Sequence, residues 1–183
     1  MGGNRQDHCA AMKRLAGTAV AFMIGCAPAF ADSDTLLPLT MKSFAAEFKK
    51  ALLQAGVHKG LAGKGCLEGG QTKRTVCSYR IGEHMAVMTS TEVGKTDLVG
   101  VTLICTGGDL ADTTECLLID AAAVSLTAPA MTFATRGKLM SALIRGMEVG
   151  DSISIVTGER RYILQKGVGV WFHVYAADSK DAQ

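Results

Sequence analysis

The sequence predicts an α+β protein in which two helices pack on one face of an antiparallel sheet of about eight strands. Three observations support this fold class. Two segments, 40–55 and 130–145, repeat apolar residues with the period of a helix. Short apolar or alternating runs between glycine turns predict hairpins. Four cysteines form two equally spaced pairs, as expected of strands joined across a hairpin.

The first helix is predicted over 40–55. Its apolar residues recur every three or four positions and form one stripe: Phe44, Phe48, Ala51, Leu52 and Ala55. Thr40 is expected to cap its start and Gly56 to end it. The second helix is predicted over 130–145, after Pro129, with Gly146 at its end.

The remaining apolar and alternating runs predict strands. Their ranges are 61–67, 73–81, 84–91, 97–106, 114–126, 152–157, 160–165 and 170–176. Gly158-Glu159 and the glycine pair around Val168 are ordinary turn signals between the last three.

The order of elements suggests an internal repeat. A displacement of 89 residues aligns Phe44-Ala45 with Phe133-Ala134 and Gly69 with Gly158. Each half, 39–106 and 114–177, would then be a helix followed by hairpins. Apolar residues of equal period coincide often, so the predicted sheet does not depend on a common origin of the halves.

Two disulfides are predicted from the cysteine spacing. Ten residues separate Cys66 from Cys77 and Cys105 from Cys116, and each pair brackets a glycine-containing turn. Four-cysteine zinc sites use pairs with two to four residues between ligands, so this spacing favours disulfides over metal. Of the three connectivities, hairpin geometry favours Cys66 with Cys77 and Cys105 with Cys116. Neither pair has the spacing of a redox-active motif, which favours a structural role.

The N-terminal region resembles an export signal. Lys13-Arg14 precede an apolar stretch, 15–27, that is too short to span a bilayer. Ala29-Phe30-Ala31 is a small-residue cleavage site, so residues 1–31 are interpreted as a signal peptide and 32–183 as one exported domain. Residues 1–11 carry charges foreign to such a signal, so Met12 is an alternative start.

Ile24-Gly25-Cys26 offers a second interpretation, because it resembles the site at which bacterial lipoproteins are lipidated. Cleavage there would leave the chain anchored to a membrane through Cys26. The better peptidase site at Ala31 favours the unanchored product. No other segment approaches a transmembrane span.

Charge argues against nucleic acid as a partner. Loss of residues 1–31 removes three of 19 basic and one of 17 acidic residues, which leaves 16 of each and a formal charge of zero. A neutral domain has no long-range field to collect an anionic polymer or membrane. The expected location is periplasmic or secreted, in a bacterium.

Two predicted strands are apolar on both faces. Residues 98–104 and 170–175 carry apolar groups where a sheet with one solvated face should alternate. The other half of the chain, a ligand, a partner protein or a second copy would each cover the second face. Trp171, His173 and Tyr175 lie on one side of the last strand, and we expect them to form an interaction surface.

Candidate catalytic residues form no recognisable motif. The histidines His58, His84 and His173 are most simply structural, although the last two fall in comparable strands of the two halves. Ser78 and Ser90 have no partner in sequence, and Met85 and Met88 alternate between faces, which disfavours a copper site. Six carboxylates are candidates for acid–base work: Glu47, Glu68, Glu83, Glu92, Asp97 and Asp120.

Charged residues flank several of the predicted turns. Lys73-Arg74 and Arg160-Arg161 flank comparable turns, whereas Asp109, Asp112 and Glu115 crowd the second cysteine pair. Basic turns at one place and acidic turns at another would orient a partner, although solvated hairpin ends explain these charges as well.

The sequence therefore predicts a non-catalytic binding or interaction module without cofactor or metal. A carrier of small molecules or lipids on the second sheet face and a hydrolase are the alternatives.

Overall fold

The computed structural model describes residues 39–69, 73–107 and 110–177, which form three helices and seven strands. Their order is α1 (Met41–Gln54), β1 (Leu61–Gly69), β2 (Arg74–Ile81), β3 (Met85–Glu92), β4 (Gly100–Cys105), α2 (Leu110–Thr127), α3 (Phe133–Val149), β5 (Ser152–Thr157), β6 (Arg160–Gly167) and β7 (Gly169–Ala176). The predicted signal peptide, Cys26 and the cleavage site lie outside the described residues.

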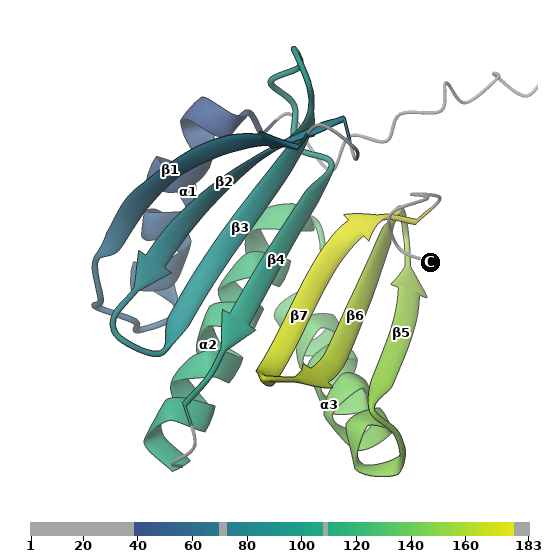
Figure 1. The fold of residues 1–183 in the computed structure, drawn as a ribbon. Coiled ribbons are helices and arrows are strands. Elements are labelled where there is room, and N and C mark those ends of the chain that lie inside the picture. The colour runs from purple at the N-terminus through teal and green to yellow at the C-terminus, as the bar shows by residue number, and fades with distance from the viewer. Residues whose placement is uncertain (1–38, 70–72, 108–109, 178–183) are drawn as a thin grey trace, which may run out of the picture. The chain divides into compact units, whose positions relative to one another are not determined.

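The strands form one antiparallel sheet in the order β1-β2-β3-β4-β7-β6-β5. All three helices lie behind this sheet in Figure 1. The predicted α+β class and the placement of helices on one face are therefore confirmed, with seven strands in place of about eight. Four strands follow α1 and three follow α3, and the internal repeat is not shown.

The predicted strand at 114–126 is wrong, because these residues belong to the helix α2. The run is apolar nearly throughout, and Ile119, Ala122, Ala123 and Val124 are all buried. Apolar residues also occupy its less buried sides, as at Leu117 and Leu118, so the run lacks the periodicity that separates helix from strand. Its length and its three consecutive alanines, Ala121 to Ala123, are the signals that favour a helix.

Helix α1 begins as its sequence predicts. The Thr40 side chain accepts a hydrogen bond from the Ser43 backbone N–H, and the Ser43 hydroxyl accepts one from Thr40 N–H. Gly56 follows the helix with a φ of 83°, a conformation that favours glycine. Its stripe packs on the sheet: Phe44 and Phe48 stack with centroids 5.1 Å apart, and Phe44 contacts Tyr79 of β2.

Helix α3 continues past its predicted end at Gly146 to Val149. Its start is capped by Thr132, whose hydroxyl accepts from Thr135 N–H. Gly146 has a packing role, since a Cβ there would overlap the Ile153 side chain of β5. The glycine therefore allows α3 to lie close to β5 and does not end the helix.

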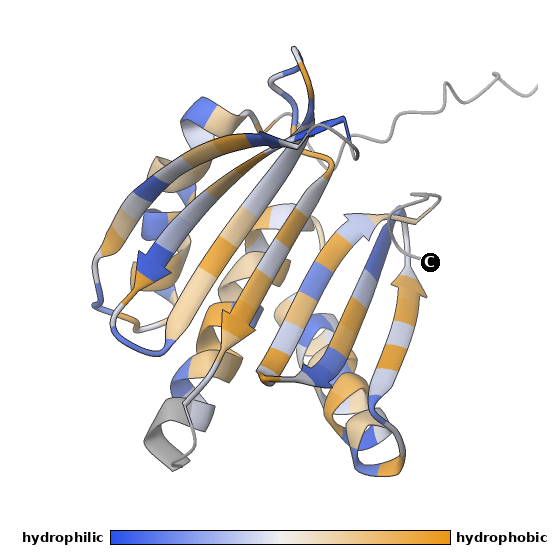
Figure 2. Ribbon diagram, viewed as in Figure 1, coloured by the Kyte–Doolittle hydropathy of each residue, from blue (hydrophilic) through white to orange (hydrophobic). Residues whose placement is uncertain are grey.

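The core lies between the sheet and the helices. One row of directly opposed residues crosses six strands on that side: Tyr79, Val87, Leu103, Phe172, Leu164 and Ile153. Four of these side chains are buried, namely Val87, Leu103, Phe172 and Leu164, and burial of such a side chain contributes roughly 1.5–3 kcal/mol of hydrophobic stabilisation. Figure 2 shows the alternation of apolar and polar residues along β5 and β7 that contributes to this row.

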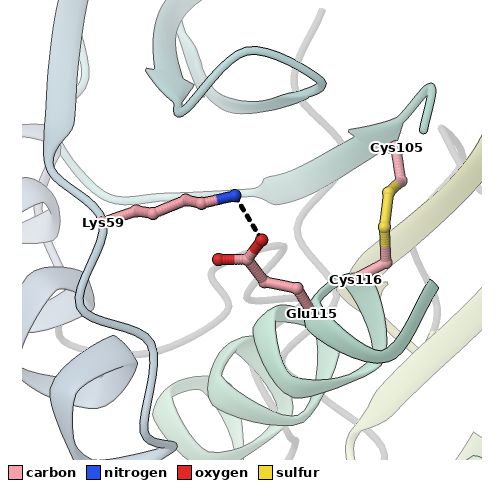
Figure 3. Close-up of polar contacts among 4 residues, drawn as sticks. All are labelled: Lys59, Cys105, Glu115 and Cys116. Atoms are coloured by element: carbon pink, nitrogen blue, oxygen red, sulfur yellow. Dashed lines mark hydrogen bonds and ion pairs between the residues drawn. A yellow bond between two sulfur atoms is a disulfide. The ribbon is translucent and has the colours of Figure 1, made fainter. Parts of the chain in front are cut away.

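Both predicted cysteine pairings are present. Cys66 and Cys77 are directly opposed in the β1–β2 hairpin, as predicted. Cys105 pairs with Cys116, but this disulfide joins the end of β4 to α2, so its description as a hairpin bridge is wrong. A second contact, the ion pair between Lys59 and Glu115, ties α2 to the segment before β1 (Figure 3).

Removal of either disulfide is expected to lower the free energy of unfolding by about 3 kcal/mol, because both close loops of the same sequence separation, 11. We propose paired serine variants, Cys66→Ser with Cys77→Ser and Cys105→Ser with Cys116→Ser, each compared with the parent by urea unfolding. Peptide mapping without reductant checks the pairing first. A cross-link between Cys66 and Cys105 would contradict the assignment.

Candidate interaction surface

The face of the sheet opposite the helices is the candidate surface, and we call it the open face. Trp171, His173 and Tyr175 alternate along β7 on this side, while their neighbours Phe172 and Val174 are buried beneath the helices. None of the three described helices covers the open face, as Figure 1 shows. The predicted interaction residues therefore share one uncovered face.

The three side chains form an aromatic ladder. The ring centroids of Trp171 and His173 are 6.0 Å apart, and those of His173 and Tyr175 are 5.9 Å apart with planes inclined by 14°. These distances lie in the range of favourable ring contacts. All three side chains are half-buried within a single chain, so their positions are set before any partner arrives.

Two glycines allow the ladder to lie flat on the sheet. A Cβ at Gly100, directly opposite Tyr175, would be 2.6 Å from the Tyr175 ring. A Cβ at Gly167 would be 3.3 Å from Trp171 Nε1, which is buried and makes no hydrogen bond within the described chain. The rings therefore cover backbone, which reduces their freedom to move.

The centre of the ladder is uncharged at neutral pH. His173 Nδ1 is 2.9 Å from Thr102 Oγ1, on the neighbouring strand β4, and 3.5 Å from the Tyr175 hydroxyl. Burial lowers the pKa of His173 below its ordinary value of 6.5, because the charged imidazolium is poorly solvated there. A neutral imidazole whose neighbours are hydroxyl groups, with no carboxylate among them, is better suited to a structural role than to acid–base chemistry.

Apolar residues extend the open face beyond the ladder. Each of the other six strands contributes one of them: Leu67, Val76, Met88, Ile104, Val156 and Ile163. Together with the ladder on β7, all seven strands therefore carry apolar or aromatic side chains on this face. Leu67 is 80% exposed and Val156 52%. The only ionisable side chains that this alternation places on the face, besides the ladder, are Arg74, Arg80, Arg161 and Glu92. The two strands at its centre, β4 and β7, carry none of these four.

The other histidines and the serines form no catalytic arrangement. His58 and His84 are exposed, in connections outside the sheet. Ser78 and Ser90 lie on the open face, and neither hydrogen-bonds a histidine or carboxylate within the described ranges. No group of three or more potential metal ligands occurs among the residues that the structure describes. Met85 is in the core and Met88 on the open face, as their spacing predicts.

Asp120 is the one buried member of the six candidate carboxylates, and its 6% exposure was not predicted from the sequence. It follows Cys116 by one helical turn on the face of α2 that the disulfide directs toward β4. Burial raises its pKa from 3.8 to about 8, because the ionised carboxylate loses its solvation. An acidic residue within an apolar run was the available signal, and the incorrect strand assignment obscured it.

The charged turns are only partly described. Arg74 lies 3.7 Å from Glu92, and Arg160 lies 3.8 Å from Glu159, and both acidic partners are well exposed. Asp109 and the side chain of Asp112 lie outside the described part of the chain. Because water solvates the acidic partner of each pair, these contacts contribute little to stability and add no argument for a docking site.

No protein-family model matches this chain, and no curated protein or solved structure matches it at a significant level. No helix in the described ranges has the length and hydrophobicity needed to cross a membrane.

Proposed function

We propose that this chain is an exported, non-catalytic interaction module whose open face binds a second copy of itself. The observation that carries the proposal is the aromatic ladder of Trp171, His173 and Tyr175 on a sheet face that no described helix covers. Soluble monomers rarely leave contiguous apolar patches of more than a few hundred Å² exposed.

The composition of the open face supports a protein contact. Interfaces are enriched in Trp, Tyr, Met and Arg and depleted in Lys and Glu, and the open face follows this bias. Its rings are already ordered, so association would lose little side-chain entropy. Two such sheets stacked face to face at about 10 Å would form a sandwich with the ladder in its centre.

A second copy is favoured over a charged partner because the centre of the face has no charge to recognise one. The two disulfides are compatible with an extracellular or periplasmic location. Export itself rests on the sequence of residues 1–31, and anchoring through Cys26 remains the minor alternative within this proposal.

Replacement of Trp171 by alanine is expected to raise the dimer dissociation constant by about tenfold or more, since truncating a central aromatic anchor has effects of this size. The measurement is sedimentation or light scattering over a concentration series, with circular dichroism as the check of the fold. Phe133→Ala is the matched control, because Phe133 is 90% exposed on the helix side. It should leave association unchanged.

The fluorescence of the wild-type chain gives an independent measurement, because Trp171 is its only tryptophan. The emission maximum of Trp171 should shift on dilution as the dimer dissociates. A wild-type chain that stays monomeric at every concentration, with emission independent of dilution, would refute self-association through this face.

A further inference from the structure

A groove crosses the helical layer, on the side of the chain away from the open face. Its floor is α2, and its walls are the C-terminal half of α1 and the N-terminal half of α3. It encloses about 560 Å³, within the range of roughly 300–1,000 Å³ that is typical of small-molecule sites. The proposed dimer does not use this surface.

The groove is apolar along most of its length. Leu117, Leu118, Met140 and Ile144 supply its larger side chains, and Phe133 lies at its rim. Leu118, Ile144 and Phe133 are exposed, although helices normally turn such residues inward. The lining is therefore suited to an apolar chain.

Small residues on all three helices leave this space open. Ala51 of α1, Ala121 of α2 and Gly137 of α3 line the groove, where larger side chains would fill it. A Cβ at Gly137 would meet no atom within 4 Å, although glycine is unfavourable inside a helix. The packing of α3 does not require glycine at this position. The effect of Gly137 is that no side chain fills the groove there.

One cation lines the groove, and no acidic residue does. Arg136 donates from Nη2 to the Pro129 carbonyl at 3.4 Å, and its Nε is buried without a hydrogen-bond partner among the described residues. The other polar lining groups are the neutral Gln54, Thr114, Ser125 and Ser141. A buried guanidinium donor is most stable when an anion accepts from it.

We infer that this groove binds a single-chain amphiphilic carboxylate, of the fatty-acid class. The carboxylate accepts hydrogen bonds from Arg136, and the hydrocarbon chain lies along α2 between α1 and α3. Charge and shape point to the same ligand, since the site pairs one cation with an elongated apolar lining. A lipid carrier that used the second sheet face would bind on the open face, whereas this groove lies in the opposite, helical layer.

The inference is tested by isothermal titration calorimetry, in which laurate is added to the full chain at concentrations below those at which laurate forms micelles. We expect saturable binding at one site per chain. Arg136→Gln should weaken it by about tenfold or more, as expected for loss of a charged hydrogen bond. Arg145→Gln removes an equivalent charge from an exposed position of α3 outside the groove and should leave laurate affinity unchanged.

Gly137→Leu tests the location of the site. The new side chain would project into the open groove without a clash at its Cβ, and leucine is a stronger helix former than glycine. We expect a folded chain, by circular dichroism and thermal unfolding, that no longer binds laurate. Unchanged laurate affinity in folded Gly137→Leu would place the ligand elsewhere and overturn the inference.

Neutral and membrane-bound probes test the ligand class. Dodecanol should bind at least tenfold more weakly than laurate, and vesicles of anionic phosphatidylglycerol should not co-sediment the chain. Equal affinity for dodecanol and laurate, unaffected by Arg136→Gln, would overturn the carboxylate assignment. Vesicle binding that Arg136→Gln abolishes, without laurate binding, would assign the groove to a membrane surface instead. A wild-type chain that does not bind laurate would also reject the proposal.

Discussion

Replacement of Gly169 by alanine is expected to lower the free energy of unfolding by about 3 kcal/mol or more. Gly169 begins β7 with a φ of 97°, which L-residues rarely adopt. A Cβ there would also overlap the carbonyl oxygen of Cys105 at the end of β4. That backbone has little freedom to retreat, because Cys105 is bonded to Cys116 of α2.

Gly158→Ala is the matched control for this substitution. Gly158 also has a positive φ, 58°, but a Cβ there meets no atom within 4 Å. It should therefore show the conformational penalty alone, about 1 kcal/mol. Urea unfolding of both variants separates backbone strain from the clash. Equal losses for the two would show that β7 moves away from β4 without penalty, contrary to the packing described.

The free energy of unfolding is expected to fall as pH rises from about 4 to 8, through Asp120. Its pKa is about 8 in the folded chain and near 3.8 when exposed, so across this window the folded state holds a proton that the unfolded state has lost. Each pH unit then removes up to about 1.4 kcal/mol, or on the order of 3 kcal/mol between pH 4.5 and 7.

Asp120→Asn isolates this contribution because it keeps the side-chain shape and cannot ionise. The difference in the free energy of unfolding between wild type and variant should change from pH 4 to pH 8 and become constant above pH 8. His173 acts in the opposite sense: its pKa is lowered by burial, so it removes stability as pH falls below 6.5 in both proteins and cancels in the difference. Parallel pH profiles of the two proteins would show that Asp120 ionises normally in the folded chain.

How much of the candidate surface can be predicted from sequence is clearest on β7. Alternation alone places Trp171, His173 and Tyr175 on one side, since successive side chains of a strand point to opposite faces. The partner Thr102 depends on the register of β4 against β7, and these strands lie about 70 residues apart in sequence. The groove could not be predicted, because the segment that forms its floor was assigned to a strand.

Local sequence determined the elements whose signals are local. Thr40 and Gly56 mark the ends of α1, the range of β5 is as predicted, and ten-residue spacing identifies both cysteine pairs. Only the tertiary structure decided that 110–127 is a helix, that Asp120 is buried and that Arg136 lines a groove. The physical reason is the same in each case: segments distant in sequence pack against one another, which makes room for α2 as a helix, desolvates Asp120 and brings Arg136 to the groove.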